Sequence, residues 1–435
     1  MKKIFFICSS SHYLNFLKEI FQILEDNIGN IEIRYIHFDS INAPDRKINE
    51  NYKSIKIHDF IKTYKTLDIY NFLRKERPDK IVILEKGSLL ERSILLASNK
   101  LGVVSIHIQE GCVPDISMTQ LQNKNEKQRV VGGNMSLLNI LKQIRKVVLL
   151  YLIYTIIYNH INKFSLLNRN FLKYSWYVFK NPIYHSWYQR SEVRATEAFC
   201  FGKKDLEYFS KIDGYTSKEV TAIGKPEFYN LIKKKKIWDE NNAFRNIDLD
   251  IRNKYSIPLK TPVALLISQY FLESHGFEDF TLDAKLKHIE ELYECISGAG
   301  YIFIDKLHPR EDQNILRKHF AKHKGIYFLK DCDLNKIIYI SDIILGYSST
   351  ALINAVILNK HPLIIDWMPK YFFDLPYYKV GTNASSIDDL RGKIKMAESG
   401  QIKTSEKDYR TFYDYFINVD MSNPPLSRII SAILD

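Results

Sequence analysis

Residues 342–365 read DIILGYSSTALINAVILNKHPLII, and this stretch decides the fold class. The apolar run 342–345 predicts a buried strand, which a glycine and a group of hydroxyl residues follow. Residues 348–358 carry apolar side chains at helical spacing, and 362–365 is a second apolar run. A strand, a helix and a strand in this order predict a parallel sheet flanked by helices.

The same alternation extends in both directions from this stretch. It predicts further strands at 3–8, 31–38, 54–58, 80–84, 103–108, 198–202, 219–224, 262–267, 301–305 and 326–329. Between them it predicts helices, among them 60–75, 89–99, 282–296, 311–322 and 334–340. We therefore predict two doubly wound α/β domains facing a shared cleft. The expected extents are 1–226 for the first domain, 227–258 for a linker, 259–405 for the second domain and 406–435 for a helical tail that packs back on the first.

The composition excludes several classes of protein. With 435 residues, 46% hydrophobic and 26% charged, the chain is expected to pack into globular domains rather than to be disordered. Its five cysteines are dispersed and form no CxxC, which excludes a disulfide framework or a zinc site of the usual spacing. The apolar run of Met1–Cys8 is too short for a signal peptide, so we expect a strand there and a reducing cytoplasm.

Most of the net charge of +12 comes from one segment, Lys127–Ser191, which has ten Lys and Arg and no Asp or Glu. The segment also holds twelve aromatic residues, and it interrupts the alternation as an insertion at 115–195. One interpretation is an interfacial element that meets the anionic headgroups of a membrane. The other is that Val147–Tyr158, too short to span a bilayer, is a buried helix beside basic residues that bind an anionic acceptor or a partner subunit. We favour the membrane surface.

Lys306-Leu307-His308-Pro309-Arg310 directly follows the predicted strand 301–305. Proline favours the first position of a helix, so His308 is expected at a helix start, where it and nearby amides can face an anion. Lys306 and Arg310 add positive charge. The structural alternative is a helix-initiating Pro309 beside a surface histidine.

Gly346-Tyr347-Ser348-Ser349-Thr350 follows another strand and opens an apolar helix. Hydroxyl residues at such a junction cap the helix, which is a sufficient structural explanation. The same hydroxyls and amides can also cradle a phosphate. Two helix starts that follow strands of one sheet can converge on one phosphate, so we predict that Ser348, Ser349 and Thr350 act together with His308.

Gln109-Glu110-Gly111 ends a strand of the first domain. A carboxylate at a strand end, followed by a glycine turn, is well placed for a general base, and a turn with a solvated Glu110 is the alternative. Ser10 and His12 follow the first strand and are candidates for substrate binding, although capping of the next helix explains them more simply.

The three motifs together resemble those of bacterial GT-B glycosyltransferases that use CMP-activated sugars. These are the sialyltransferases and polysialyltransferases and, more distantly, the capsule Kdo transferases, with an acidic-acidic-Gly motif, an HP motif and an S-S/T motif. This sequence offers Gln109-Glu110-Gly111, His308-Pro309 and Ser348-Ser349, so only Glu110 can be the base. Residues 340–366 also resemble the polyol-phosphate transferases of wall teichoic acid synthesis.

The resemblance implies two Rossmann-like domains around a central cleft and inverting, metal-independent transfer. The donor would be a CMP-sugar carrying sialic acid or a related nonulosonic acid, and the acceptor a bacterial capsule or lipooligosaccharide glycan that can be lipid-linked. His308, Pro309, Ser348, Ser349 and Thr350 would bind the nucleotide phosphate, with His308 as a proton donor and Glu110 as the base. No cofactor is expected, and the enzyme would lie in the cytoplasm on the inner face of the cytoplasmic membrane.

Two other classes of function stay open. One is a transferase with another donor, a CDP-polyol phosphate or a UDP-sugar. The other is a non-catalytic protein that binds membrane or nucleic acid, and we expect no nucleic acid because the charge is confined to the insertion and no such motif occurs. Two Asp-x-Asp sequences, 248–250 and 331–333, are not expected to bind metal, since the first lies in the predicted linker and Asp333 is an expected helix N-cap.

Overall fold

The structure, a computed structural model, describes residues 1–26, 29, 31–42, 48, 52–84, 89–111, 153, 193–269, 281–347, 349–367 and 375–435. The predicted insertion, with its basic segment Lys127–Ser191, lies outside the described residues apart from a few positions. The chain divides into two compact units. Unit 1 contains residues 1–111, 193–225 and 418–435, and unit 2 contains residues 226–417.

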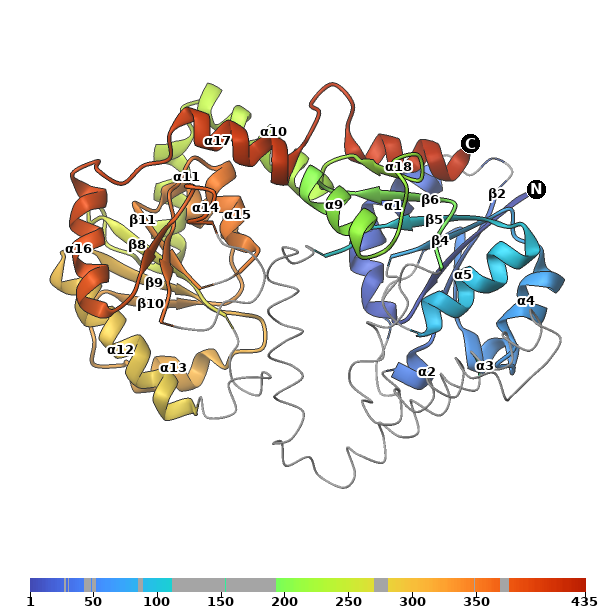
Figure 1. Cartoon of the computed structure of the whole chain (residues 1–435). Coiled ribbons are helices and arrows are strands. Elements are labelled where there is room, and N and C mark those ends of the chain that lie inside the picture. The colour runs from blue at the N-terminus through green and yellow to red at the C-terminus, as the bar shows by residue number, and fades with distance from the viewer. Residues whose placement is uncertain are drawn as a thin grey trace, which may run out of the picture. The chain divides into compact units, whose positions relative to one another are not determined.

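Within its described residues, unit 1 has a seven-stranded sheet in the order β3-β2-β1-β4-β5-β6-β7, and each pair of neighbours is parallel. Figure 1 labels β2, β4, β5 and β6 of this sheet. The strands are β1 (Lys2–Cys8), β2 (Ile31–His37), β3 (Ile55–Asp59), β4 (Lys80–Ile83), β5 (Val104–Ile108), β6 (Glu197–Cys200) and β7 (Val220–Ala222). The helices are η1 (Ser11–Tyr13), α1 (Leu14–Asp26), α2 (Asp39–Asn42), α3 (Phe60–Tyr64), α4 (Ile69–Glu76), α5 (Leu89–Leu101), α9 (Lys203–Lys211) and α18 (Pro425–Leu434).

The last helix of the chain, α18, belongs to the core of unit 1. Ile429 and Ile433 of α18 pack into the same cluster as Phe6 of β1 and Leu17 of α1. Gly224 supports this return of the chain, because it has φ +83° and a Cβ there would lie 2.8 Å from the Val419 side chain. One face of the first sheet is therefore covered jointly by an early helix and the final one.

Unit 2 has a six-stranded sheet, counted over the described residues, in the order β10-β9-β8-β11-β12-β13 with parallel neighbours. The strands are β8 (Val263–Ile267), β9 (Ile302–Lys306), β10 (Ile326–Leu329), β11 (Ile343–Gly346), β12 (Leu363–Ile365) and β13 (Thr382–Ala384). The helices are α10 (Pro226–Glu240), α11 (Phe244–Tyr255), α12 (Leu282–Gly298), α13 (Gln313–His319), α14 (Leu334–Ile340), α15 (Ala351–Ile357), α16 (Ile387–Glu398), α17 (Glu406–Phe412) and the π-helix η4 (Tyr413–Ile417). These two sheets confirm the predicted α/β class.

The stretch that we predicted to be a linker is helical. The helices α10 and α11 make up most of residues 226–255. Both belong to unit 2, where α10 contacts α15 and α11 contacts α14. Phe228 and Leu231 on α10, and Ile247 and Ile251 on α11, are buried. The lysine run 233–236 hid this pattern, because it interrupts the apolar positions of α10, of which only Phe228 and Leu231 are buried.

Two histidines of unit 2, the buried His288 and the half-buried His361, lie in hydrogen-bonded settings. The ring nitrogens of His361 lie 2.8 Å from Thr404 Oγ1 and 2.9 Å from Thr382 Oγ1. Burial lowers the pKa of His361 to about 4, and burial likewise lowers the pKa of His288 to about 4. Protonation of either ring in the folded state would place a charge where it is poorly hydrated.

Acid should therefore destabilise unit 2 through these rings. Their pKa values are lower in the folded than in the unfolded chain, so stability is present above pH 6.5 and is lost as the pH falls toward 4. Each ring contributes up to about 1.4 kcal/mol per pH unit in that window. Urea unfolding at several pH values should show a smaller loss on acidification for His361→Gln than for the wild type. The exposed His319→Gln is the control, and equal pH dependence in all three proteins would contradict this account.

Candidate active site

The carboxyl ends of β8, β9 and β11 lie side by side at one edge of the second sheet. The register aligns Ile267 of β8 with Lys306 of β9 and with Gly346 of β11. Because β8 has neighbours on both sides that come later in the chain, this edge is a switch point of the sheet, where α/β proteins bind ligands. Neighbouring strands are about 4.8 Å apart, so the loops after β9 and β11 begin about 10 Å from each other.

The loop after β9 carries His308, but not at a helix start as we predicted. The next helix, α13, begins at Gln313, and the carboxylate of Asp312 caps it by accepting the Asn314 amide at 2.8 Å. His308 and the exposed Pro309 lie instead in a turn, closed by a hydrogen bond of 2.9 Å from the Glu311 amide to the His308 carbonyl. Asp312 is a stronger N-cap than the residues before Pro309, which explains the difference.

The ring of His308 is oriented by its own loop. Nδ1 accepts the backbone N–H of Arg310 at 3.2 Å, so we assign the proton of the neutral ring to Nε2. Partial burial lowers the pKa of His308, Glu311 opposes this, and Arg310, Lys306 and Lys285 lower it again. A neutral ring with an Nε2–H can donate a hydrogen bond to an anionic oxygen.

The two basic residues near His308, Lys306 and Arg310, have different roles. Arg310 is exposed at the carboxyl edge, and its charge adds to the positive field there. The ammonium of Lys306 donates to the backbone carbonyl of Leu307 at 2.8 Å and is partly buried. Lys306 therefore contributes mainly long-range charge in this structure.

The loop after β11 supplies hydroxyl groups at the same edge. Ser349 Oγ accepts the Ala351 amide at 3.3 Å, and Thr350 is exposed at the N-cap position of α15. Ser348 lies outside the described residues. Gly346 allows the close approach of α15, because a Cβ there would lie 2.7 Å from the Leu352 side chain. The helix expected from 348 thus begins at Ala351.

Beneath the His308 loop lies a buried group of ionisable side chains that sequence reasoning missed. Lys285 of α12 forms an ion pair with the Glu311 carboxylate, and their side chains are 8% and 1% exposed. Ser268, the residue after β8, also donates to Glu311, at 3.3 Å. The signal for Lys285 was present in the sequence, since it falls on the apolar stripe of α12 with Ile289 and Leu292.

Asp305, the next-to-last residue of β9, belongs to the same group. It is fully buried, and among the described residues neither carboxylate oxygen has a hydrogen-bond partner of good geometry. Burial and the neighbouring Glu311 raise the pKa of Asp305 to about 8, against the opposing effects of Lys285, Ser268 and Lys306. The shift favours the neutral form of Asp305 beside the ion pair of Lys285 and Glu311.

In unit 1, the Gln109-Glu110-Gly111 motif follows β5 as predicted. Gln109 is buried and joins two strands, because its side-chain oxygen accepts the Phe201 amide at 3.0 Å and its amide donates to the Gly111 carbonyl at 2.8 Å. A carboxylate could accept the first bond but could not donate the second. This structural role explains why a glutamine stands where the glycosyltransferases that this sequence resembles have an acidic residue. Glu110 is half-exposed at the same edge.

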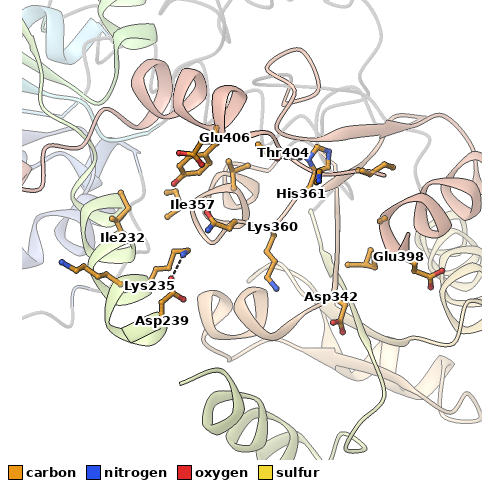
Figure 2. Close-up of a pocket in the computed structure, with 18 of the residues that line it drawn as sticks. Ile232, Lys235, Asp239, Asp342, Ile357, Lys360, His361, Glu398, Thr404 and Glu406 are labelled. Atoms are coloured by element: carbon orange, nitrogen blue, oxygen red, sulfur yellow. Dashed lines mark hydrogen bonds and ion pairs between the residues drawn. The ribbon is translucent and has the colours of Figure 1, made fainter. Parts of the chain in front are cut away.

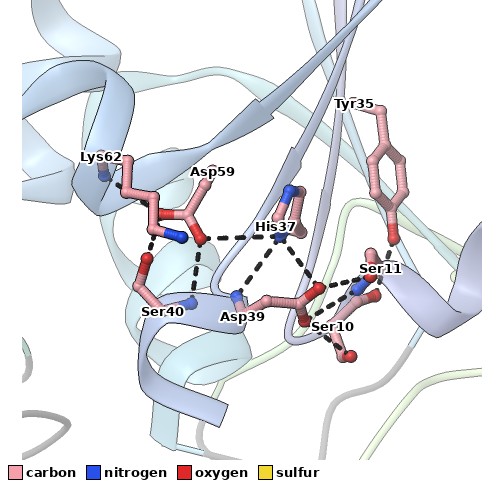
Figure 3. A network of polar contacts seen from close by, with 8 residues as sticks. All are labelled: Ser10, Ser11, Tyr35, His37, Asp39, Ser40, Asp59 and Lys62. Carbon is pink, nitrogen blue, oxygen red and sulfur yellow. Dashed lines mark hydrogen bonds and ion pairs between the residues drawn. The ribbon is translucent and has the colours of Figure 1, made fainter. Parts of the chain in front are cut away.

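The other candidates of unit 1 lie after β1. Ser10 Oγ donates to the buried Asp39 carboxylate at 2.8 Å, Ser11 donates to the same carboxylate through its amide at 3.0 Å and through its hydroxyl, and the Asp39 oxygen lies 3.3 Å from His37 Nδ1 (Figure 3). Ser10 is thus engaged in a network that fixes the ends of β1 and β2. His12 is exposed, and its ring lies 3.7 Å from that of Tyr13.

A pocket of about 1000 Å³ lies at the opposite, amino edge of the second sheet (Figure 2). Tyr301, Asp342 and His361, which precede β9, β11 and β12, line it together with side chains of α10 and α17. Its lining mixes lysines with carboxylates, as in the ion pair of Lys235 with Asp239. The motifs therefore place the candidate site at the carboxyl edge and not in this pocket.

The Asp-x-Asp sequences have structural explanations in unit 2. The Asp333 carboxylate accepts the amides of Asn335 and Lys336 and caps α14, which confirms the predicted N-cap. Asp248 lies inside α11 and pairs with Arg252 at 2.6 Å. Among the described residues, no group of three His, Cys, Asp or Glu side chains is arranged to hold a metal. Over the same residues, the helices are all too short or too polar to cross a bilayer.

No family model and no curated protein matches the sequence. Solved structures do match over nearly the whole chain. The wall teichoic acid polymerase TagF is 13% identical, with a TM-score of 0.55 over 100% of this chain and 88% of that one. The UDP-GlcNAc 2-epimerase from Methanocaldococcus jannaschii is 15% identical, with a TM-score of 0.51 over 99% of each chain. A TagF structure soaked with CDPG gives a TM-score of 0.52 at 12% identity.

At these identities the likeness establishes the fold. The chain has a two-domain α/β architecture of the GT-B type, which confirms the fold class predicted from the sequence.

The substitution Gln109→Glu tests the structural role of Gln109. It replaces a donor to the Gly111 carbonyl by a buried acceptor, so we expect a loss of about 1–3 kcal/mol in the free energy of unfolding at pH 7. The loss should shrink in acid, where a protonated carboxyl can donate again. Urea unfolding measures both effects, with Glu110→Gln, at the half-exposed neighbouring position, as the control. Unchanged stability of Gln109→Glu at pH 7 would refute the assignment.

Asp305→Asn tests the neutral state of Asp305. The pKa of this carboxyl is higher in the folded than in the unfolded chain, so its stability contribution is present below pH 4 and is lost as the pH rises toward 8. The amide does not titrate, so the variant should gain on the wild type by about 1.4 kcal/mol per pH unit between pH 5 and 7. Asp388→Asn, on the exposed start of α16, is the control. A constant difference between Asp305→Asn and the wild type would show that Asp305 is ionised.

Proposed function

We propose that the protein is an inverting, metal-independent glycosyltransferase that moves sialic acid or a related nonulosonic acid from a CMP-sugar to a bacterial surface glycan. One observation carries the proposal. The loop with His308 follows β9 and the loop with Ser349 and Thr350 follows β11, and these strands lie on either side of β8 at the switch point of the second sheet. The GT-B type fold, which nucleotide-sugar enzymes such as the UDP-GlcNAc 2-epimerase also have, supports it.

The groups at this edge suit a phosphate leaving group. When the bond from the sugar to CMP breaks, negative charge grows on the phosphate. The Nε2–H of His308 and the hydroxyls of Ser349 and Thr350 are donors that stabilise such charge, and Arg310 adds a positive field. Ser348 completes the set in this proposal. Loss of one such donor lowers the rate by roughly 10²–10³.

Glu110 is the proposed general base. It removes the proton from the acceptor hydroxyl while the hydroxyl oxygen attacks the anomeric carbon, and CMP leaves from the opposite face with the bonding electrons. The direct displacement inverts the anomeric centre and needs no covalent intermediate. Gln109 is an amide that bonds to Phe201 and Gly111, so the carboxylate of this motif is that of Glu110.

A second candidate donor is a CDP-polyol phosphate. The likeness to the wall teichoic acid polymerase TagF, including the form soaked with CDPG, favours it. Both donors share a cytidine and a phosphate that departs, so the same His308 and hydroxyl loops suit either. The proposals differ in the atom that is attacked, an anomeric carbon in the first and a phosphorus in the second.

We further propose that the acceptor is a lipid-linked or lipopolysaccharide glycan at the inner face of the cytoplasmic membrane. The charge of Lys127–Ser191, ten basic residues without an acidic one, supports this proposal. Sedimentation with vesicles should show binding to phosphatidylglycerol vesicles at low salt and loss at high salt. Equal binding to neutral phosphatidylcholine vesicles, or none to either, would contradict it.

A donor panel tests the enzymatic proposal. The full-length protein is incubated with CMP-sialic acid, CDP-glycerol or UDP-GlcNAc, with and without EDTA, and the released nucleotide is measured. We expect CMP from CMP-sialic acid in either condition, a drop of roughly 10²–10⁴ in Glu110→Gln, and one of roughly 10²–10³ in His308→Ala. The exposed Glu207→Gln is the matched control.

The other outcomes of the panel decide between the proposals. Turnover of CDP-glycerol alone would replace the first donor by the second. Turnover that EDTA abolishes would overturn metal independence. Failure of all three donors, together with no binding of CMP, would reject a cytidine-nucleotide transferase.

A further inference from the structure

The side chain and the backbone of Glu311 bond both to the His308 loop and to neighbouring elements. One carboxylate oxygen, Oε2, accepts the backbone N–H of His308 at 2.6 Å. The other, Oε1, receives the ammonium of Lys285 and the hydroxyl of Ser268. The backbone of Glu311 is held as well, because its carbonyl accepts Lys330 Nζ at 2.9 Å. One side chain thus joins the loop to the ends of neighbouring elements.

The elements that meet at Glu311 lie next to those that carry the candidate site. Ser268 follows β8, Lys330 follows β10, and Lys285 projects from α12, which packs on the sheet. Tyr347, at the start of the hydroxyl loop, lies 3.0 Å from His288 Nε2 of α12, so α12 contacts both loops. A displacement of α12 would therefore move both proposed phosphate-binding loops.

We propose that Glu311 and Lys285 are positioning residues for His308. Their buried ion pair fixes the turn that carries the imidazole at the carboxyl edge of the sheet, and it sets the charge next to the ring. The inference deepens the proposed function and rests on it for the identity of the phosphate ligand. Neither residue is expected to touch the substrate, since both side chains are more than nine-tenths buried.

The chemistry of the buried group favours this role over a purely structural one. A buried ion pair is a weak source of stability, because removing two charges from water offsets most of their attraction. Here the pair holds a polar turn, which an apolar pair of similar size could not do, since only an acceptor can bond the His308 amide. The ammonium of Lys285 contacts the Glu311 carboxylate, whereas Asp305 has no hydrogen-bond partner of good geometry among the described residues.

The geometry makes Glu311→Gln the informative variant. A glutamine keeps an oxygen for the His308 amide but loses the negative charge that raises the pKa of the His308 ring. The double variant Lys285→Met/Glu311→Gln removes both buried charges and guards against a single variant that does not fold. Lys287→Met is the matched control, because Lys287 lies two residues after Lys285 on the same helix and is exposed.

The first measurement needs no substrate. The ring signals of His308, identified by their absence in His308→Gln, are followed by NMR over pH in the full-length protein. Glu311→Gln should lower the pKa of His308 by roughly half a pH unit, and Lys287→Met should leave it unchanged. If neither Glu311→Gln nor the double variant moves the His308 titration, the proposed positioning is wrong.

The second measurement is a double-mutant cycle on the affinity for CMP. We expect Glu311→Gln to weaken CMP binding by roughly tenfold and to have no further effect in a His308→Ala background, because it acts through that ring. Fully additive losses would indicate a general structural role and would overturn the proposal. If the His308 titration shifts as expected and the wild type binds no CMP, the cytidine-nucleotide function fails and the positioning role stands.

Discussion

The parallel direction of the strands is the constraint on which the rest of this structure depends. In each sheet all described neighbours run the same way, so the residues that follow the strands collect at a single edge. That alone brings His308 and Ser349, some forty residues apart in sequence, to the two sides of β8. It also places Glu110 and Ser10 at one edge of the first sheet, with β4 between their strands. A parallel fold gathers polar groups that the sequence keeps apart.

Much of this could be predicted from the sequence, because apolar runs of strand length are unambiguous when helices separate them. The strands expected at 301–305 and 326–329 are found as Ile302–Lys306 and Ile326–Leu329. The helix starts were less accurate. Pro309 was expected to begin a helix, whereas the helix begins four residues later at Gln313, with Asp312 as its N-cap. Two possible caps compete here, and only the fold shows which one is used.

The partners of buried charges could not be predicted, since they depend on register and on which helix covers which strand. The spacing of Lys285 within α12 indicates burial, yet nothing in the sequence pairs it with Glu311. Gln109 is a similar case. Its neighbour Phe201 lies on the far side of a long insertion, so its role as a bridge between strand ends appears only in the folded chain. Residues of this kind determine whether the side chains of a motif lie in the positions that its function needs.

The position of α18 has a consequence for synthesis on the ribosome. Because Ile429 and Ile433 pack in one cluster with residues of β1 and α1, this core keeps an uncovered apolar face until residues 425–434 have been synthesised. Unit 2, whose described elements all precede Asn418, can fold earlier than the unit that precedes it in the chain. Unit 2 of the nascent protein can therefore fold before unit 1. The amino-terminal half is the part that a chaperone would need to protect longest.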